Sequence, residues 1–133
     1  MNTLKLDLPV GDLIPVLLGA SPEALRTARR LFRNYGRISR LFCSKAPVAS
    51  ILAPYIKVHA IKSESNQLML TALEDFAKQA RHVDVVLYLI PCTMEDSNFV
   101  WKNRETLELD YVIAGNTVMD DVWFGSEREE ETQ

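Results

Sequence analysis

Short apolar runs alternate with amphipathic stretches along this chain. Leu13–Leu18 is apolar on both faces, which is typical of a buried parallel strand. Val83–Ile90 is the most apolar stretch and is the best candidate for a central strand. Further strands are predicted at Ile38–Cys43, Ile56–Ile61 and Tyr111–Ala114. We therefore expect a sheet of about five strands.

Between these runs, apolar residues recur at helical spacing. A first helix is predicted to follow Ser21, which can cap its N-terminus, and to end at Gly36. A second helix is expected from about Asn66 to Ala80 and a third over Glu95–Leu107. Ala46–Leu52 is expected to be a loop or a short helical turn.

Strands that alternate with helices predict an α/β fold with right-handed crossovers. The expected architecture is a three-layer Rossmann-like sandwich with a mainly parallel sheet, in which the second and fourth strands flank the first. A length of 133 residues with 47% hydrophobic residues fits one domain with a substantial core. We expect this domain to span residues 1–125 and residues 126–133 to be an acidic, disordered tail.

Charge gives little indication of a polyanionic partner. The formal net charge is −3, and the segment from Ser126 to the end, with four glutamates and one arginine, accounts for all of it. Five arginines line the first helix, where an anion-binding face is one interpretation and a solvated helix face the simpler one, so we expect no nucleic-acid partner. These arginines are Arg26, Arg29, Arg30, Arg33 and Arg37.

The cysteines and histidines suggest neither a disulfide framework nor a metal site. Cys43 and Cys92 each lie in or just after an apolar run, so we expect free, reduced thiols. His59 and His82 lack cysteine or carboxylate partners at ligand spacing. The N-terminus does not resemble a signal peptide and no apolar run approaches membrane-spanning length, so we expect a cytoplasmic protein without a membrane partner.

Two turns are candidates for a binding site. In a parallel sheet, ligands bind at the carboxyl ends of the strands, where Gly19-Ala20-Ser21 and Pro91-Cys92-Thr93 should both lie. The first turn lacks the G-x-G-x-x-G pattern of a dinucleotide site and the chain contains no P-loop, so Gly19 is explained more simply by backbone geometry. Cys92 could act as a nucleophile at the start of a helix, although an inert, half-buried thiol is the simpler interpretation.

Four stretches resemble a known family when taken in order and spacing. They are "PVLLG", "ALRTARRLFRNYGRIS", "LIPCT" and "NRETLELDYVI", and the match covers roughly Pro15 to Ala114. They look like the N-terminal, pre-ATP-grasp domain of the ATP-grasp carboxylate-amine ligases, the group that includes D-aspartate ligase-like enzymes. In such ligases this Rossmann-like domain forms one wall of the acceptor or carboxylate site.

The resemblance implies a function without catalysis by this chain alone. In the family, ATP, magnesium and the acyl-phosphate chemistry belong to an ATP-grasp module, for which the residues after Ala114 are too few. We therefore expect no cofactor of its own, with ATP and magnesium reached only through a partner ATP-grasp chain. The expected function is an accessory or substrate-wall subunit of a split ATP-dependent carboxylate-amine ligase. The alternative is a Rossmann-like module that binds a small ligand or a protein without any ligase partner.

The resemblance also implies a set of site residues. The family's substrate contacts map onto Gly19, Ala20 and Ser21 in the first turn and onto Pro91, Cys92 and Thr93 in the second. The spacing of Gly19, Ser21 and Glu23 also matches the G-x-S-x-E pattern of the related D-alanine–D-alanine ligases, where the glutamate orients the substrate amine. A glutamate in a first helical turn also simply complements the helix dipole, so both interpretations of Glu23 stay open.

The aromatic pair Trp123 and Phe124 is the remaining candidate. It follows the last predicted strand, so its side chains must either cover the sheet or contact a partner. We expect the segment Val118–Gly125 to form an interface with the rest of the domain, with a second copy or with an ATP-grasp partner.

Overall fold

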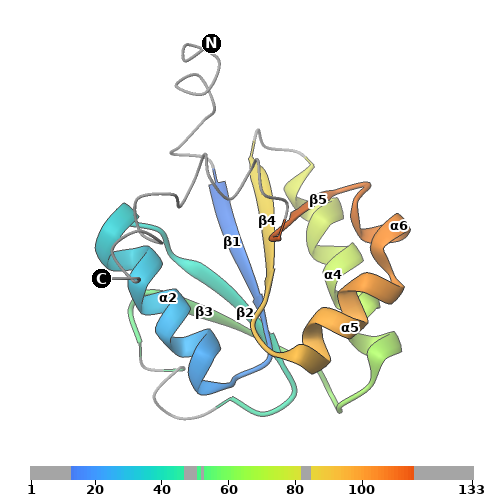
Figure 1. The fold of residues 1–133 in the computed structure, drawn as a ribbon, viewed down its shortest axis with the longest axis horizontal. Helices are drawn as coiled ribbons and strands as arrows, with labels where there is room; N and C mark the ends of the chain where they lie inside the picture. The colour runs from blue at the N-terminus through green and yellow to red at the C-terminus, as the bar shows by residue number, and fades with distance from the viewer. Residues whose placement is uncertain (1–12, 47–50, 52, 82–84, 116–133) are drawn as a thin grey trace.

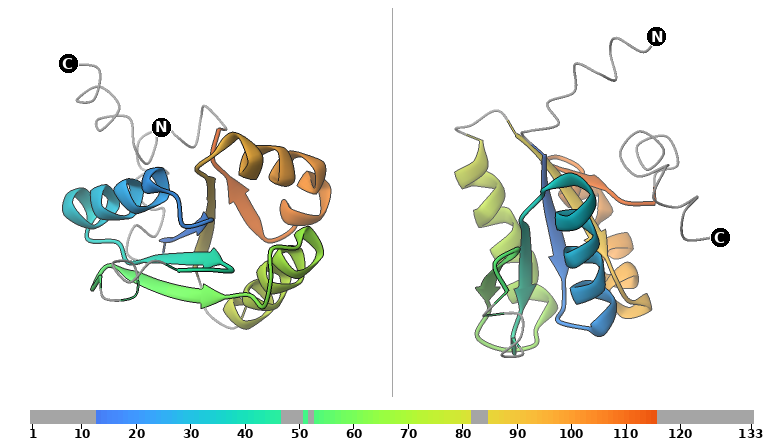
Figure 2. Two further views of the ribbon diagram at one scale, coloured as in Figure 1. Left: turned by 90° about the horizontal axis from the view of Figure 1, so that it is seen from below. Right: turned by 90° about the vertical axis from the view of Figure 1, so that its left-hand side faces the viewer.

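The computed structural model describes residues 13–46, 51, 53–81 and 85–115 of the chain. Five parallel strands form one sheet in the order β3-β2-β1-β4-β5. Helices lie on both sides of this sheet (Figures 1 and 2), so the predicted three-layer Rossmann-like sandwich is confirmed. The predicted position of the first strand between the second and the fourth is also confirmed.

The elements follow the predicted order. In sequence they are β1 (Leu13–Leu18), α2 (Pro22–Tyr35), β2 (Ser39–Cys43), β3 (Ile56–Ala60), α4 (Asn66–Ala80), β4 (Val86–Pro91), α5 (Met94–Lys102), α6 (Arg104–Leu107) and β5 (Tyr111–Ile113). Parts of the predicted elements at Ala46–Leu52 and Val83–Ile90 lie outside the described residues.

The chain between α2 and β2 departs from the sequence prediction. Gly36 has a φ of 68° and ends α2, as predicted. The next residue, Arg37, donates its backbone N–H to the carbonyl of Leu31 and is buried, with 9% of its surface exposed. The prediction that Arg37 belongs to a solvated arginine stripe was therefore wrong, because the left-handed turn at Gly36 directs the chain back toward the sheet.

The predicted third helix is divided in two. Asn103 separates α5 from α6 with φ −110° and ψ 20°, outside the helical region. Its side-chain Nδ2 donates a hydrogen bond to the Phe99 carbonyl at 2.9 Å, an interaction by which asparagine competes with helical backbone bonds. One continuous helix over Glu95–Leu107 was therefore an incorrect prediction.

The two faces of the sheet are covered differently. On one face, Leu17, Leu41 and Ile56 of the sheet pack against Ala24 and Ala28 of α2. The opposite face carries the larger core, to which α4, α5 and α6 all contribute. That core contains Val16, Leu18, Phe42, Leu87, Leu89 and Tyr111 from the strands and Leu73, Phe76, Phe99, Val100 and Leu107 from the helices.

Candidate functional site

A cleft opens at the carboxyl ends of the strands. These strand ends lie at the lower edge of the ribbon in Figure 1. The cleft has a volume of about 660 Å³ and is lined by the turns that follow β1, β2, β3 and β4. This is the edge at which open parallel sheets bind ligands, and the cleft lies beside the switch point between β1 and β4, where the strand order reverses. The lining residues are Gly19, Ala20, Ser21, Cys43, Ser44, Lys45, Ile61, Glu64, Ser65, Asn66, Met69, Thr93, Glu95, Asp96, Asn98, Phe99 and Lys102.

The first wall of the cleft depends on Gly19. Its φ of 77° lies in the left-handed region of backbone conformation, which residues other than glycine rarely adopt. A Cβ atom at this position would also lie 3.1 Å from Oδ2 of Asp96. The Gly19 N–H donates to the carbonyl of Phe42 at 2.9 Å, which ties this turn to β2. Gly19 is thus required both by the backbone conformation and by the close approach of a carboxyl group.

The facing wall is the first turn of α5. Thr93 caps this helix, since its Oγ1 accepts the N–H of Asp96 at 3.1 Å. The same hydroxyl donates to Oδ2 of Asp96 at 2.8 Å. Burial raises the pKa of Asp96, the hydrogen bond from Thr93 lowers it, and the charge of Glu95 raises it. The cleft therefore contains a half-buried carboxyl group held by its own helix cap.

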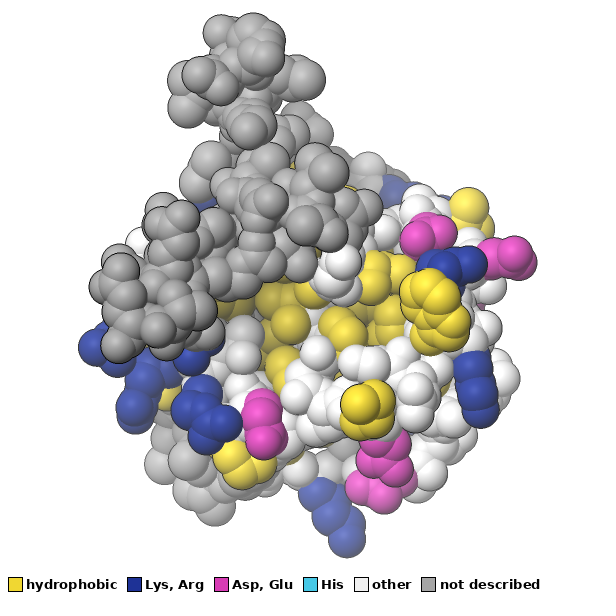
Figure 3. Space-filling model, viewed as in Figure 1, with side chains coloured by type: hydrophobic (Ala, Val, Ile, Leu, Met, Phe, Trp, Pro, Cys, Tyr) yellow, Lys and Arg dark blue, Asp and Glu magenta, His cyan; other side chains and the backbone are white. Residues whose placement is uncertain are grey.

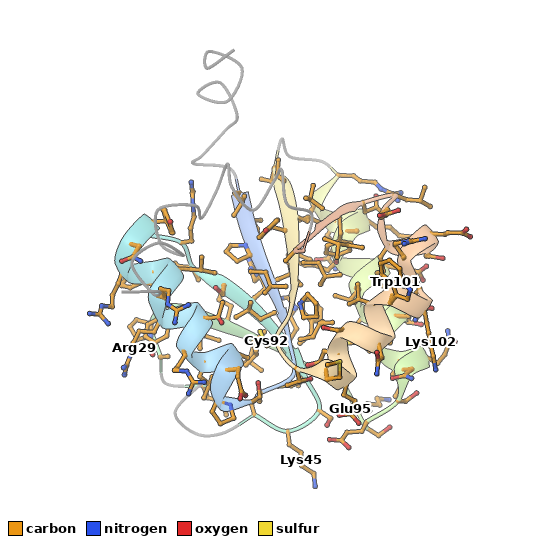
Figure 4. All side chains as sticks on the ribbon, viewed as in Figure 1. Arg29, Lys45, Cys92, Glu95, Trp101 and Lys102 are labelled. Carbon is orange, nitrogen blue, oxygen red and sulfur yellow. The ribbon has the colours of Figure 1, made fainter. Side chains whose placement is uncertain are left out.

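Groups of both charges line the cleft. Besides Asp96 it contains the acidic side chains of Glu64 and Glu95, and it has two amines, Lys45 and Lys102. Figure 4 shows Lys45 and Glu95 at the lower edge of the molecule, on the loop after β2 and on α5. Such a mixed lining suits a small ligand that carries both an amine and a carboxylate.

Three helices also begin at the cleft. The N-terminal caps of α2, α4 and α5 are Ser21, Ser65 and Thr93, and all three line the cavity. Each cap oxygen accepts a backbone N–H of its own helix, at 3.1, 3.3 and 3.1 Å respectively. The positive ends of three helix dipoles therefore lie around one cavity, which favours an anionic group there.

The structure separates the sequence-predicted site residues into two groups. Gly19, Ala20, Ser21 and Thr93 all line the cleft. The other three do not: Glu23 is exposed on the first turn of α2, Pro91 lines a second cavity beside β5, and Cys92 packs between the sheet and α2. Trp123 and Phe124 lie outside the described residues.

The chemistry of Cys92 does not favour a nucleophile. Burial raises its pKa to about 12, with a further increase from the charge of Asp96, a decrease from a hydrogen bond with Thr27 and an increase from Glu23. Its thiol lies 3.6 Å from the carbonyl oxygen of Ile90, two residues earlier on its own chain. In Figure 4 Cys92 lies further inside the molecule than the cleft residue Glu95. The interpretation as an inert thiol agrees with this environment.

Sequence reasoning missed all five charged side chains of the cleft. Lys45 follows β2, Glu64 precedes α4, and Glu95, Asp96 and Lys102 lie on α5. The loops after β2 and β3 could have been inferred, because all parallel strands present their carboxyl ends at one edge. The contact between Asp96 and Gly19 depends on how α5 packs on β4 and gives no signal in the sequence.

Within the described ranges, no group of three histidine, cysteine or carboxylate side chains is arranged to hold a metal ion. Among the helices described, none has the length and apolar character needed to span a bilayer. Comparisons with protein-family models, with curated proteins and with solved structures found no match to this chain.

Proposed function

We propose that this chain binds a small amine- and carboxylate-bearing substrate, such as an amino acid, and forms the substrate wall of a split ATP-dependent carboxylate-amine ligase. The observation that carries this proposal is the cleft at the carboxyl edge of the sheet. Gly19, Ala20, Ser21 and Thr93, which the ligase resemblance implies as substrate contacts, line this one cavity. The proposal assigns ATP and magnesium to a separate ATP-grasp partner chain.

The charges of the cleft support an amino-acid ligand. Asp96 offers a carboxylate to an ammonium group, and Lys45 or Lys102 offers an ammonium to a carboxylate. The three helix N-termini favour the carboxylate as well. Neither Glu23 nor Cys92 lines this cavity, so the proposal gives them no contact with the substrate.

The direct test is a titration of the isotopically labelled protein with D-aspartate, L-aspartate and D-alanine, followed by backbone amide shifts. A wall that supplies only part of a site is expected to bind weakly, with a dissociation constant of about 1 mM, or roughly −4 kcal/mol. Shifts are expected at Ser44, Thr93 and Asp96 and not at Ile56, at the opposite end of the sheet. Asp96→Asn should weaken binding about tenfold, whereas Glu108→Gln, outside the cleft, should leave it unchanged.

The same titration with Mg-ATP checks the assignment of ATP to a partner. No saturable shift is expected, because the sequence has neither a P-loop nor a G-x-G-x-x-G turn and the proposal assigns ATP to the partner chain. A micromolar dissociation constant for Mg-ATP would contradict the proposal. Absence of any shift with all three amino acids would also contradict it.

The second candidate function is a small-ligand or protein-binding module without a ligase partner. It rests on the same cleft and differs only in what completes the site. An adjacent reading frame that encodes an ATP-grasp module favours the split ligase. Amino-acid binding without such a reading frame favours the independent module.

A further inference from the structure

One part of the sheet has no described helix on it. On the α2 side, the alternate residues of β4 and β5 point the same way and form an apolar surface, here called the β4–β5 face: Val86, Tyr88, Ile90, Val112 and Ala114. The helix described on this side, α2, packs mainly over β1 and β2, and its core cluster reaches β4 only at Ile90 and the adjoining Cys92. Figure 3 shows hydrophobic side chains gathered in this central region, between α2 and α5.

Parallel sheets are normally covered on both sides, and Tyr88 at the centre of the β4–β5 face is buried, with 1% of its surface exposed, although no described helix lies over it. The opposite side of β4 and β5 follows this rule, since Leu87, Leu89 and Tyr111 lie in the core with α4 and α5. Beside the β4–β5 face lies a second cavity, of about 640 Å³. Val112, Ala114, Gly115 and Trp101 are among its lining residues. The β4–β5 face is thus apolar, and the cavity beside it has room for further side chains.

We propose that residues 118–124 of this same chain dock on the β4–β5 face and supply the cover that the described helices do not. Gly115 lines the cavity itself, so the chain that continues from it starts at the surface to be covered. The segment that follows is rich in large apolar side chains, and Val118, Met119, Val122 and Trp123 have the spacing of one side of a helix. Trp123 and Phe124 are the two largest groups available to fill the cavity.

The distribution of charge also favours residues 118–124 as the segment that docks on the β4–β5 face. Arg26, Arg29 and Arg33 are exposed on α2, the helix that borders the β4–β5 face, and form no ion pair with any described residue. Figure 4 shows Arg29 on the outer side of α2. The four glutamates between Ser126 and Gln133 follow directly after the apolar segment. Once residues 118–124 lie on the sheet, this acidic segment is brought within reach of the α2 arginines.

A covalently attached segment also has an advantage over a second copy. Its effective concentration at the β4–β5 face is set by a linker of a few residues and lies in the millimolar range or above, independent of protein concentration. The docked segment lies on a face of the sheet and the candidate substrate cleft at its carboxyl edge. The docking proposal is therefore independent of the ligase proposal, and either can fail without the other.

The primary test uses the unaltered full chain. Nuclear Overhauser contacts are expected between the aromatic protons of Trp123 or Phe124 and the methyl groups of Val112 and Ile90. A mixture of isotopically labelled and unlabelled protein distinguishes contacts within a chain from contacts between chains. Contacts found only between chains would overturn the proposal in favour of a second copy, and a complete absence of contacts would overturn it as well.

A paired substitution supplies a second measurement. Replacing Trp123 and Phe124 together by alanine is expected to lower the melting temperature by roughly 5–15 °C with unchanged molecular mass. The matched control is the double substitution of Met94 and Leu109 by alanine, since these apolar side chains are 77% and 78% exposed in the described structure. This control should shift the melting temperature by less than about 2 °C. Equal effects of the two double substitutions, or a fall in molecular mass for the first, would overturn the proposal.

Discussion

At the scale of single residues, Gly19 and Gly36 form a natural comparison. Both have positive φ values, 77° and 68°. A Cβ at Gly36 would meet no atom within 4 Å, whereas a Cβ at Gly19 would lie 3.1 Å from Asp96. Substitution at the two positions therefore separates two free-energy costs of adding a Cβ. Gly36 reports the cost of the backbone conformation alone, and Gly19 adds the cost of a close contact.

We expect Gly36→Ala to lower the free energy of unfolding by about 1 kcal/mol, the cost of a left-handed conformation with a Cβ. Gly19→Ala should cost about 2 kcal/mol, because the Asp96 carboxylate is held by Thr93 and does not move aside freely. Urea denaturation measures both values. In an Asp96→Ala background the cost of Gly19→Ala should fall to that of Gly36→Ala. Equal costs in the unaltered background would show that the cleft does not hold Asp96 in place.

At the scale of secondary-structure elements, the pairing of β2 with β3 determines the surroundings of His59. The register places Phe42 beside His59, and their rings stack with centroids 4.4 Å apart. Nη1 of Arg40, on β2, lies 3.2 Å from Nε2 of His59, and its guanidinium lies 5.4 Å from the ring centroid of Phe76 in α4. Burial lowers the pKa of His59, and the charges of Arg40 and Lys57 lower it further.

This arrangement predicts a loss of stability on acidification. The folded state disfavours protonated His59. The contribution of the neutral imidazole to the free energy of unfolding is therefore fully present above the unfolded pKa of about 6.5, and it is lost as the pH falls below that value. Nuclear magnetic resonance titration of the imidazole should give a pKa below 6.5 for the unaltered protein. Arg40→Met should raise this pKa, because it removes one of the two nearby positive charges.

Lys78→Met is the control for this titration, since it removes a positive charge from the exposed surface of α4 without removing a named partner of His59. It should leave the His59 pKa unchanged. A pKa at or above 6.5 in the unaltered protein would show that burial and the Arg40 charge do not act on this histidine as the structure indicates.

The whole molecule shows which features the sequence could predict. Apolar runs such as Leu13–Leu18 have few alternatives to a buried strand, and the crossover rule then limits the possible orders of the strands in the sheet to a few. The break at Asn103 and the burial of Arg37 were missed because both depend on local hydrogen bonds that do not alter the hydrophobic pattern. The same limit applies to the cleft, where the positions of the turns could be predicted and the approach of Asp96 to Gly19 could not.

The positions of the two cysteines test the strand order of the whole sheet. Cys43 ends β2 and Cys92 follows β4, so the whole of β1 lies between their strands. Two strand spacings separate such positions by roughly 10 Å, beyond the reach of a disulfide bond. Both thiols are free in the structure, and burial raises the pKa of each.

We therefore expect two titratable thiols in denaturant without reductant, and slow modification of both by iodoacetamide at pH 8 in the native protein. With a pKa of about 12, only a very small fraction of Cys92 is thiolate at pH 8, so its alkylation should be far slower in the native protein than in the urea-unfolded protein. Mass spectrometry of the alkylated peptides measures each site separately, and the urea-unfolded protein is the reference for full reactivity. Rapid native labelling of Cys92 would place this thiol at the surface of the cleft and reopen its assignment as a nucleophile. A disulfide between Cys43 and Cys92 would instead require β2 and β4 to be neighbours, which is incompatible with β1 at the centre of the sheet.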